Sequence, residues 1–188
     1  MEGYYKTPAS VEEYIKMAAG YDGRELIDQL KQYLTPGASV LEIGMGPGKD
    51  LDILQDHYHA TGSDFSKVFL ARYLSKNPQA DLLQLNAVDL DTEKKFDCLY
   101  SNKVLHHLSN NELKGSIKNQ HRILRDFGLV CHSFWKGKGE ESISGLLFNY
   151  HTVKDLTELF ASNFDILKMD MYMEFEEDDS ILLIGRKK

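Results

Sequence analysis

The feature that most constrains this chain is a short apolar strand that runs directly into a glycine-rich turn. Residues 38–43 read as a buried strand, and Gly44, Gly46 and Gly48 follow at every second position. Residues 50–57 then show the apolar spacing of a short helix. Glycine adopts backbone angles that other residues avoid and lets the chain approach a ligand closely. A strand, a glycine turn and a helix in this order indicate a site for a nucleotide-like ligand.

The rest of the chain alternates in the same way. We expect strands over residues 38–43, 59–63, 81–85, 96–100 and 129–134, and helices over 24–34, 50–57, 66–77, 109–125 and 152–160. An earlier helix is expected to begin at a capping box of Ser10 and Glu13, and residues 136–141 read as a flexible loop. Residues 164–186 read as two strands joined by an acidic turn at 174–179. Strands separated by helices of this length predict βαβ units and a parallel sheet.

Length and charge limit the possible functions. The 188 residues fit one domain with a single core, and the net charge of -7 argues against nucleic acid as the main partner. No apolar run approaches the roughly 20 residues that span a bilayer, and residues 1–8 lack the apolar core of a signal peptide. Cys98 and Cys131 lie in apolar segments, where a buried reduced thiol is expected. We therefore expect a cytoplasmic protein without a metal site.

Two carboxylates narrow the meaning of the glycine turn. Glu42 stands two residues before the first glycine, and Asp64 ends the second expected strand, where it could bind both hydroxyls of a ribose. Lys49 stands where the dinucleotide fingerprint G-x-G-x-x-G/A needs its last small residue. A ligand with a ribose, an adenine and a cationic amino-acid tail would use both carboxylates. As alternatives, Glu42 could be a solvated strand-end carboxylate and Asp64 a helix cap.

With these residues in view, the chain resembles the class I S-adenosylmethionine-dependent methyltransferases, over residues 39–130 and more weakly to the C-terminus. Within them it is most similar to the small-molecule enzymes of the ubiquinone/menaquinone-biosynthesis type. The supporting stretches are 40–48, 62–66, 85–87, 96–108 and 122–128, the last with Phe127 where the family has glycine. The resemblance implies a Rossmann-like, doubly wound α/β fold. Its seven-stranded sheet would be mostly parallel with one antiparallel C-terminal strand, and helices would cover both faces.

The resemblance also implies how the chain would bind S-adenosylmethionine and its product S-adenosylhomocysteine. Residues 1–36 would form a helical lid over a core of residues 37–188, within a single domain. The implied cofactor-binding residues are Glu42, Gly44, Met45, Gly46, Asp64, Phe65, Ser66, Asn86, Ala87, Ser101, Asn102 and Tyr21. Among them Glu42 would orient the ammonium, Asp64 would hold the ribose, and Asn86 would address the adenine amino group. Many family members have aspartate where Asn86 stands, and Asn86 could instead belong to a plain loop.

The acceptor side is less specific. His106 and His107 follow the fourth expected strand, close to the expected methyl group, so one of them could act as a general base; the alternative is a packed and a solvent-facing histidine. Aromatic residues that follow the fifth strand could line an acceptor pocket or simply pack: Trp135, Phe148, Tyr150 and His151. Residues 101–104 lack the D/N-P-P-Y/F sequence that positions exocyclic amines, which disfavours DNA methylation.

We therefore predict a methyltransferase that acts on a small molecule by in-line displacement, as a monomer or a homodimer. One alternative is a non-catalytic module that binds the cofactor without transferring methyl groups. A protein or RNA methyltransferase is another, although the acidic charge lowers the RNA option. A nicotinamide-dependent oxidoreductase is disfavoured by Lys49 and Glu42.

Overall fold

The computed structural model describes residues 7–188, so most of the segment that bears on a signal peptide lies outside the described residues. The helices are α1 (Pro8–Met17), α2 (Arg24–Leu30), α3 (Lys49–Gln55), α4 (Lys67–Lys76), α5 (Asn110–Ile123) and α6 (Val153–Phe160), with a 3₁₀ turn η2 (Leu105–His107). The strands are β1 (Ser39–Ile43), β2 (His59–Asp64), β3 (Leu82–Gln84), β4 (Phe96–Asn102), β5 (Leu124–Trp135), β6 (Glu140–Ile143), β7 (Leu146–Asn149), β8 (Phe164–Tyr172) and β9 (Ser180–Lys187). Within residues 7–188, no helix has the length and apolar character that a bilayer span requires.

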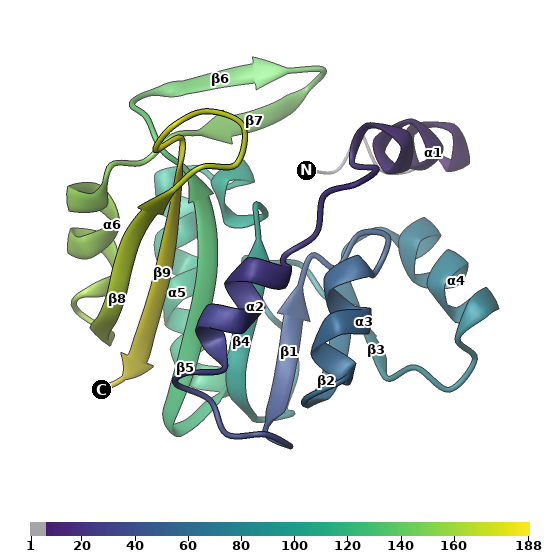
Figure 1. Cartoon of the computed structure of the whole chain (residues 1–188), viewed down its shortest axis with the longest axis horizontal. Helices are drawn as coiled ribbons and strands as arrows, with labels where there is room; N and C mark the ends of the chain where they lie inside the picture. Colours follow the sequence, from purple (N-terminus) through teal and green to yellow (C-terminus); the bar gives the residue numbers. More distant parts are fainter. Residues whose placement is uncertain (1–6) are drawn as a thin grey trace.

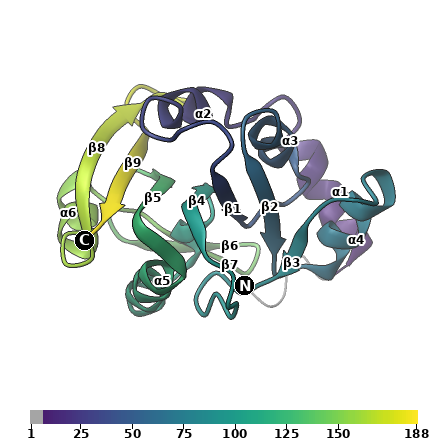
Figure 2. The same ribbon diagram turned by 90° about the horizontal axis from the view of Figure 1, so that it is seen from below.

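The main sheet has seven strands in the order β3-β2-β1-β4-β5-β9-β8 (Figure 1). All neighbouring strands are parallel except β9, which runs antiparallel to both β5 and β8. Helices α2 and α3 cover one face of the sheet, and α5 and α6 cover the other (Figure 2). The predicted doubly wound architecture is confirmed. The strand order reverses between β1 and β4, and ligands of such sheets bind at the carboxyl ends of the strands near that point.

Two apolar cores lie on the two faces of the sheet, because side chains alternate along each strand. Val40 of β1 packs toward α2, α3 and α4, whereas Leu41 and Ile43 pack toward α5 and α6. Glu42, the next-to-last residue of β1, shares the face of Val40 and therefore lies on the α3 side of the sheet. Both cysteines are buried free thiols on that same face, as the sequence predicted.

Three local predictions were wrong. Helix α1 is capped by Thr7, whose side chain accepts from the Ser10 N–H, because Pro8 already fits the first helical turn. Residues 140 and 141 of the expected loop instead belong to β6, which pairs with β7 in a hairpin. The hairpin was not predicted because both strands are short and β6 is mostly polar. Helix α2 ends at Leu30 rather than at residue 34. The helix starts expected at residues 109 and 152 are confirmed, because Ser109 and Thr152 are the N-caps of α5 and α6 and each forms a capping box.

Candidate functional site

The glycine turn after β1 needs its glycines for different reasons. Gly44, Gly46 and Gly48 all have positive φ, at 71°, 50° and 85°. A β-carbon on Gly44 would lie 2.6 Å from a Val104 methyl group, whereas one on Gly46 would meet only the Tyr14 ring, at 3.7 Å. Position 44 therefore requires glycine both for its backbone angle and for close packing against Val104. At Gly46 the backbone faces open space.

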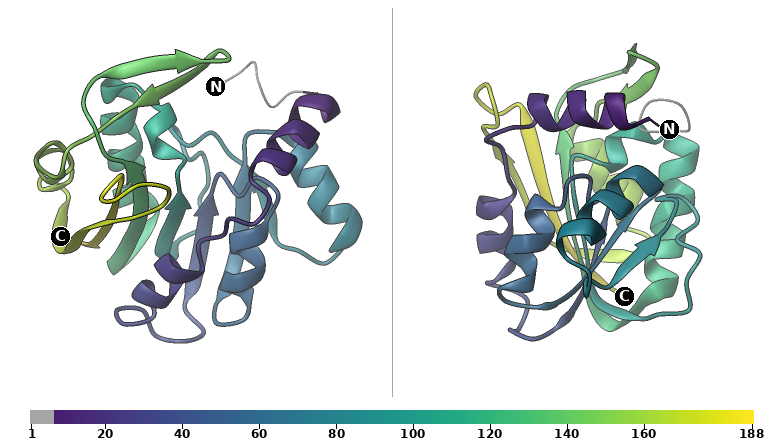
Figure 3. Two further views of the ribbon diagram at one scale, coloured as in Figure 1. Left: turned by 45° about the horizontal axis from the view of Figure 1, so that its top comes forward. Right: turned by 90° about the vertical axis from the view of Figure 1, so that its right-hand side faces the viewer.

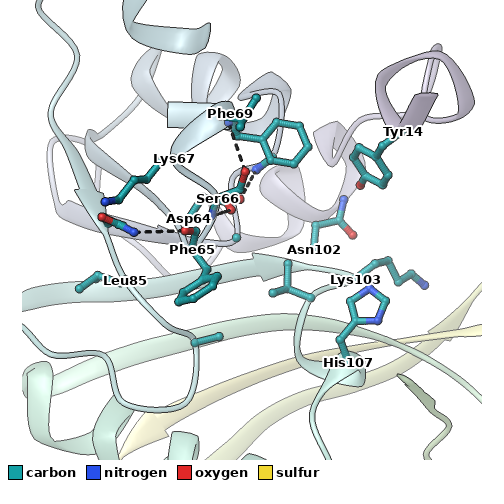
Figure 4. A pocket seen from close by; sticks show the side chains of 16 residues that line it. Tyr14, Asp64, Phe65, Ser66, Lys67, Phe69, Leu85, Asn102, Lys103 and His107 are labelled. Carbon is teal, nitrogen blue, oxygen red and sulfur yellow. Dashed lines mark hydrogen bonds between the residues drawn. The ribbon is translucent and has the colours of Figure 1, made fainter. Parts of the chain in front are cut away.

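That space is a cavity of about 380 Å³ at the carboxyl ends of β1, β2 and β4 (Figure 4). Of the residues predicted from sequence, the cavity is lined by Gly44, Gly46, Asp64, Phe65, Ser66, Ala87, Asn102 and His107. The remaining lining residues are Tyr14, Lys67, Val68, Phe69, Gln84, Leu85, Lys103 and Val104. Glu42, Met45, Asn86, Ser101, Tyr21 and His106 were also predicted for the site but do not line it.

Asp64 joins the glycine turn to helix α4. Its carboxylate accepts the backbone N–H of Gly46 at 2.9 Å and that of Ser66 at 2.7 Å. Burial raises the pKa of this carboxyl, and the backbone N–H groups of Ser66, Gly46 and Phe65 oppose that rise. Asp64 thus accepts a backbone N–H at the start of α4, as the helix-cap alternative from the sequence expected. The N-cap residue of α4 itself is Ser66. Each carboxylate oxygen keeps a further lone pair that could accept from a ligand hydroxyl.

Glu42 is the least satisfied acid in this region. The residue is 3% exposed, and its Oε2 atom has no hydrogen-bond partner among the described residues. Burial raises the pKa of its carboxyl well above the usual range, and the charges of Asp50, Asp64 and Asp52 raise it further. An unpaired buried carboxyl is costly, so this arrangement favours a cationic ligand that would pair with it.

Asp50 was missed by the sequence reasoning although it organises the site. Its buried carboxylate accepts the Gly23 N–H at 2.7 Å, the Tyr100 hydroxyl at 2.8 Å and the Asn102 amide at 3.1 Å. It thereby connects the N-terminal segment, α3 and the end of β4. An aspartate in the first turn of a helix is common because its charge favours the helix N-terminus. Nothing in the neighbouring sequence distinguishes Asp50 from such a residue.

Three of the predicted cofactor residues have partners elsewhere. The Met45 side chain is buried in the core, where its sulfur lies close to Gly62. The Ser101 hydroxyl is buried against His132 Nδ1 at 2.8 Å. The Asn86 side-chain oxygen accepts the Val88 N–H at 2.8 Å, which is the plain loop geometry considered from the sequence. Their proposed contacts with a cofactor remain predictions.

The N-terminal segment lies over the glycine turn. Helix α1 lies beside α4 beyond the ends of the central strands (Figure 3), with Tyr14 edge-on to Phe69. The Lys49 ammonium donates to the carbonyls of Ala18 at 2.8 Å and Tyr21 at 3.2 Å. Lys49 thus joins the N-terminal segment to α3 by two hydrogen bonds. In the sequence it was noted only as a mismatch to the dinucleotide fingerprint. The Tyr21 ring points away to Phe175, with ring centroids 5.0 Å apart.

The two histidines differ in their surroundings. His107 lines the cavity, and its Nδ1 lies 2.6 Å from the Leu147 carbonyl oxygen. A carbonyl only accepts, so Nδ1 carries the proton and Nε2 of the neutral ring keeps a lone pair. His106 is 2% exposed, and neither of its ring nitrogens has a partner among the described residues. Burial lowers the pKa of both imidazoles, and so both are neutral at pH 7.

Lys103 is a second residue that the sequence did not reveal. It follows β4 with a φ of 52°, which is strained for a residue with a β-carbon. Its ammonium lies 3.7 Å from the centroid of the Trp135 ring and donates to Phe134 O at 3.3 Å and to Ser180 Oγ at 2.5 Å. Burial lowers the pKa of this group to about 8. The described residues contain no group of three or more His, Cys, Asp or Glu side chains that could hold a metal ion.

Comparison with known proteins agrees with this architecture. Residues 40–128 match the family model described as a methyltransferase domain. An uncharacterized methyltransferase from Synechocystis sp. is 31% identical over 100 residues, which are 52% of this chain and 47% of that protein. The chain thus spans about half the length of this curated relative.

Solved structures share the fold at low identity. An S-adenosylmethionine-dependent methyltransferase from Clostridium acetobutylicum superposes with a TM-score of 0.76 at 12% identity, covering 94% of this chain and 96% of its own. The 1,6-didemethyltoxoflavin-N1-methyltransferase of Burkholderia thailandensis, with 1,6-didemethyltoxoflavin and S-adenosylhomocysteine bound, gives a TM-score of 0.75 at 20% identity, covering 96% of this chain and 88% of its own. The N-methyltransferase NodS of Bradyrhizobium japonicum, in complex with S-adenosylhomocysteine, gives 0.74 at 14% identity and covers 99% of both chains.

Proposed function

We propose that this protein, which carries a methyltransferase domain and has the fold of the class I S-adenosylmethionine-dependent methyltransferases, transfers a methyl group to a small-molecule acceptor. The single observation that carries the proposal is the buried, unpartnered Glu42 carboxyl beside the glycine turn. A ligand with a cationic amino-acid tail would supply the missing partner. The acids Asp50, Asp52 and Asp64 add negative potential there, which opposes a diphosphate such as that of NAD.

The residues around the cavity fit the cofactor along its length. Gly44 and Gly46 would lie along the methionine part, and Asp64 would accept from the ribose hydroxyls. Glu42 does not line the cavity itself, but its buried carboxyl lies next to the glycine turn and would orient the ammonium from there. The adenine would lie between Phe65 and Leu85, close to the backbone of Ala87. In this arrangement Asp50 is a positioning residue, because it holds Asn102 and Gly23 around the same space. When bound, the cofactor supplies an electrophilic methyl group on a sulfonium.

His107 is the proposed proton acceptor. Its Nδ1–H is held by Leu147, which fixes the tautomer and leaves the basic Nε2 for a ligand in the cavity that His107 lines. An acceptor hydroxyl or amine would attack the methyl carbon while its proton passes to Nε2. His107 would hold that proton as an imidazolium, and the positive charge of the bound sulfonium would be lost when its methyl group is transferred.

A small acceptor is supported by two observations. The cavity is limited in size, and the Burkholderia enzyme with the same fold was crystallised with 1,6-didemethyltoxoflavin bound. The buried free thiols Cys98 and Cys131 fit a reducing compartment, and we retain the cytoplasm as the proposed location. A non-catalytic binding module remains the competing function, because the same cofactor contacts would serve it.

Calorimetry with S-adenosylhomocysteine tests the cofactor assignment. We expect a dissociation constant in the micromolar range, equivalent to about -8 kcal/mol. Tighter binding of NAD than of S-adenosylhomocysteine would overturn the assignment. Methyl transfer is then tested with labelled S-adenosylmethionine and a panel of hydroxylated and amino-bearing aromatic compounds; cofactor binding without any labelled product would favour the non-catalytic module.

The base is tested by His107→Asn, whose amide keeps the contact to the Leu147 carbonyl but has no atom in the place of Nε2. We expect turnover to fall by about 100- to 10,000-fold with the affinity for S-adenosylhomocysteine unchanged. His59→Asn changes an exposed histidine and serves as the matched control. Full turnover in the His107 variant would rule out base catalysis by this residue.

A further inference from the structure

The face of the Trp135 ring is covered by a side chain from a distant loop. Trp135 ends β5, and the Phe175 ring stacks on it with centroids 5.5 Å apart and an interplanar angle of 18°. Phe175 lies between β8 and β9 and is 59% exposed, so most of its ring remains in contact with solvent. The pair has the geometry of a planar aromatic ring seated on a platform.

The loop that carries Phe175 does not depend on that stack for its shape. Asp179 accepts the backbone N–H groups of Glu174 at 2.8 Å, Phe175 at 2.9 Å and Glu176 at 3.0 Å. These bonds close the turn from within. The Phe175 ring could therefore leave the Trp135 face, and its edge contact with Tyr21, by rotating outward while the turn keeps its fold.

One residue of the cavity wall, Lys103, lies next to this platform, although Trp135 and Phe175 do not line the cavity themselves. The Lys103 ammonium lies 3.7 Å from the Trp135 centroid, and Lys103 also lines the cavity (Figure 4). His106 is edge-on to Trp135 at 6.5 Å, and its two buried ring nitrogens have no partner among the described residues. His107, the proposed base, lies beside His106 with ring centroids 3.9 Å apart and the two ring planes tilted by 47°. A flat surface, a cation and an unsatisfied imidazole thus adjoin the proposed site of methyl transfer.

We propose that Trp135 is the stacking platform of the acceptor site and that the acceptor is a planar aromatic ring with a hydroxyl or amino substituent, which takes the place of Phe175. This inference rests on the proposed function and names its class of substrate. The ring substituents would offer hydrogen-bond partners to His106, and the Lys103 charge favours an electron-rich or anionic ring over a cationic one.

The test uses the fact that Trp135 is the sole tryptophan of the chain. A ¹H–¹⁵N spectrum therefore contains one indole N–H signal, which reports on this platform alone. The protein, with S-adenosylhomocysteine present, is titrated with resorcinol and separately with cyclohexane-1,3-diol, which carries the same hydroxyls on a ring that is not flat. We expect a saturable shift of the indole signal with resorcinol and none with the diol. Equal shifts, or no shift with resorcinol, would overturn the proposal.

Two pairs of variants test the occupant and the platform by calorimetry with resorcinol. Phe175→Ala should tighten binding about three- to tenfold, the range set by the loss of a competing aromatic pair, whereas Phe127→Ala, at an exposed phenylalanine on another loop, should not. Unchanged or weaker binding in the Phe175 variant would contradict the displacement. Trp135→Leu should weaken binding about tenfold or more while Trp135→Phe retains it; equal losses in both, or none, would count against stacking.

The two proposals fail in different ways. If S-adenosylhomocysteine does not bind but resorcinol still shifts the indole signal, the proposed function is wrong and the stacking site stands. If S-adenosylhomocysteine binds and resorcinol gives no shift, the proposed function stands and the inference about the acceptor is wrong.

Discussion

Replacing Glu42 with glutamine would remove a buried ionisable carboxyl beside the glycine turn while keeping the shape of the side chain. In the proposed complex the carboxylate pairs with the cofactor ammonium, and hydrogen bonds to charged groups are worth about 1.5 to 3 kcal/mol. We therefore expect Glu42→Gln to weaken binding of S-adenosylhomocysteine by about 10- to 150-fold. Glu25→Gln, which removes an exposed carboxylate from α2, should leave the affinity unchanged.

The pH dependence of binding gives a sharper test. Burial and the charges of Asp50, Asp64 and Asp52 raise the pKa of Glu42 in the free protein, whereas a bound ammonium would favour the ionised form. Below that raised pKa, cofactor binding should release a proton, and affinity should fall as the pH falls, by at most about one logarithmic unit per pH unit.

The assay is calorimetry between pH 5.5 and 7.5, in pairs of buffers with different ionisation enthalpies, which counts the protons released. We expect proton release in the wild-type protein and its loss, together with a flatter pH dependence, in Glu42→Gln. If the wild-type protein releases no proton while the variant binds equally well, Glu42 is not the partner of the cofactor. If both proteins release the same number of protons, another carboxyl is responsible.

Three further changes probe the surroundings. Asp64→Asn leaves one side-chain oxygen for the Gly46 and Ser66 N–H groups, so S-adenosylhomocysteine should bind about 1 to 3 kcal/mol more weakly by calorimetry; an unchanged affinity would remove Asp64 from the site. Gly44→Ala places a β-carbon 2.6 Å from a Val104 methyl group at a residue with positive φ, so the melting temperature of the variant should fall. Adding Val104→Ala to the same chain should restore part of the loss, and no recovery would contradict the steric explanation. Burial lowers the pKa of His132 to about 3, which makes the unfolded state bind a proton first, so stability should fall as the pH drops from 6.5 toward 3, by at most about 5 kcal/mol from this group. Denaturant titrations of His132→Asn should show a shallower loss over that pH range, and an equal slope would exclude this histidine.

The alternation of side chains along β4 explains several differences between the sequence prediction and the structure. Tyr100 and Asn102 lie on the α3 side, where both donate to Asp50, whereas Ser101 between them points to the opposite face and to His132. The sequence placed Ser101 and Asn102 together at the strand end, which is correct for the backbone. Which of the two side chains faces the cavity depends on which face of the sheet each residue of β4 points to. The short apolar run in the sequence does not reveal this.

Local chemistry determined most of the fold. Buried strands, capping boxes and the glycine turn are patterns within a few residues, so their positions followed from the chain alone. The β6–β7 hairpin was missed because its strands are short and partly polar, and they form only through pairing with each other. The N-terminus of α1 was misplaced by one helical turn, since Thr7 and Ser10 are both good capping residues and Pro8 decided between them.

The sequence by itself determined the strand–glycine turn–helix unit, the carboxylates Glu42 and Asp64, and hence the kind of ligand that the turn would suit. Tertiary structure alone decided that Lys49 fastens the N-terminal segment, that Asp50 joins three elements, and that Lys103 and Phe175 meet at Trp135. The physical reason is the separation along the chain of the residues that interact. Turns, caps and strands are fixed by interactions between near neighbours, whereas the partners of a charged or aromatic side chain are set by which distant segments the closed sheet brings together.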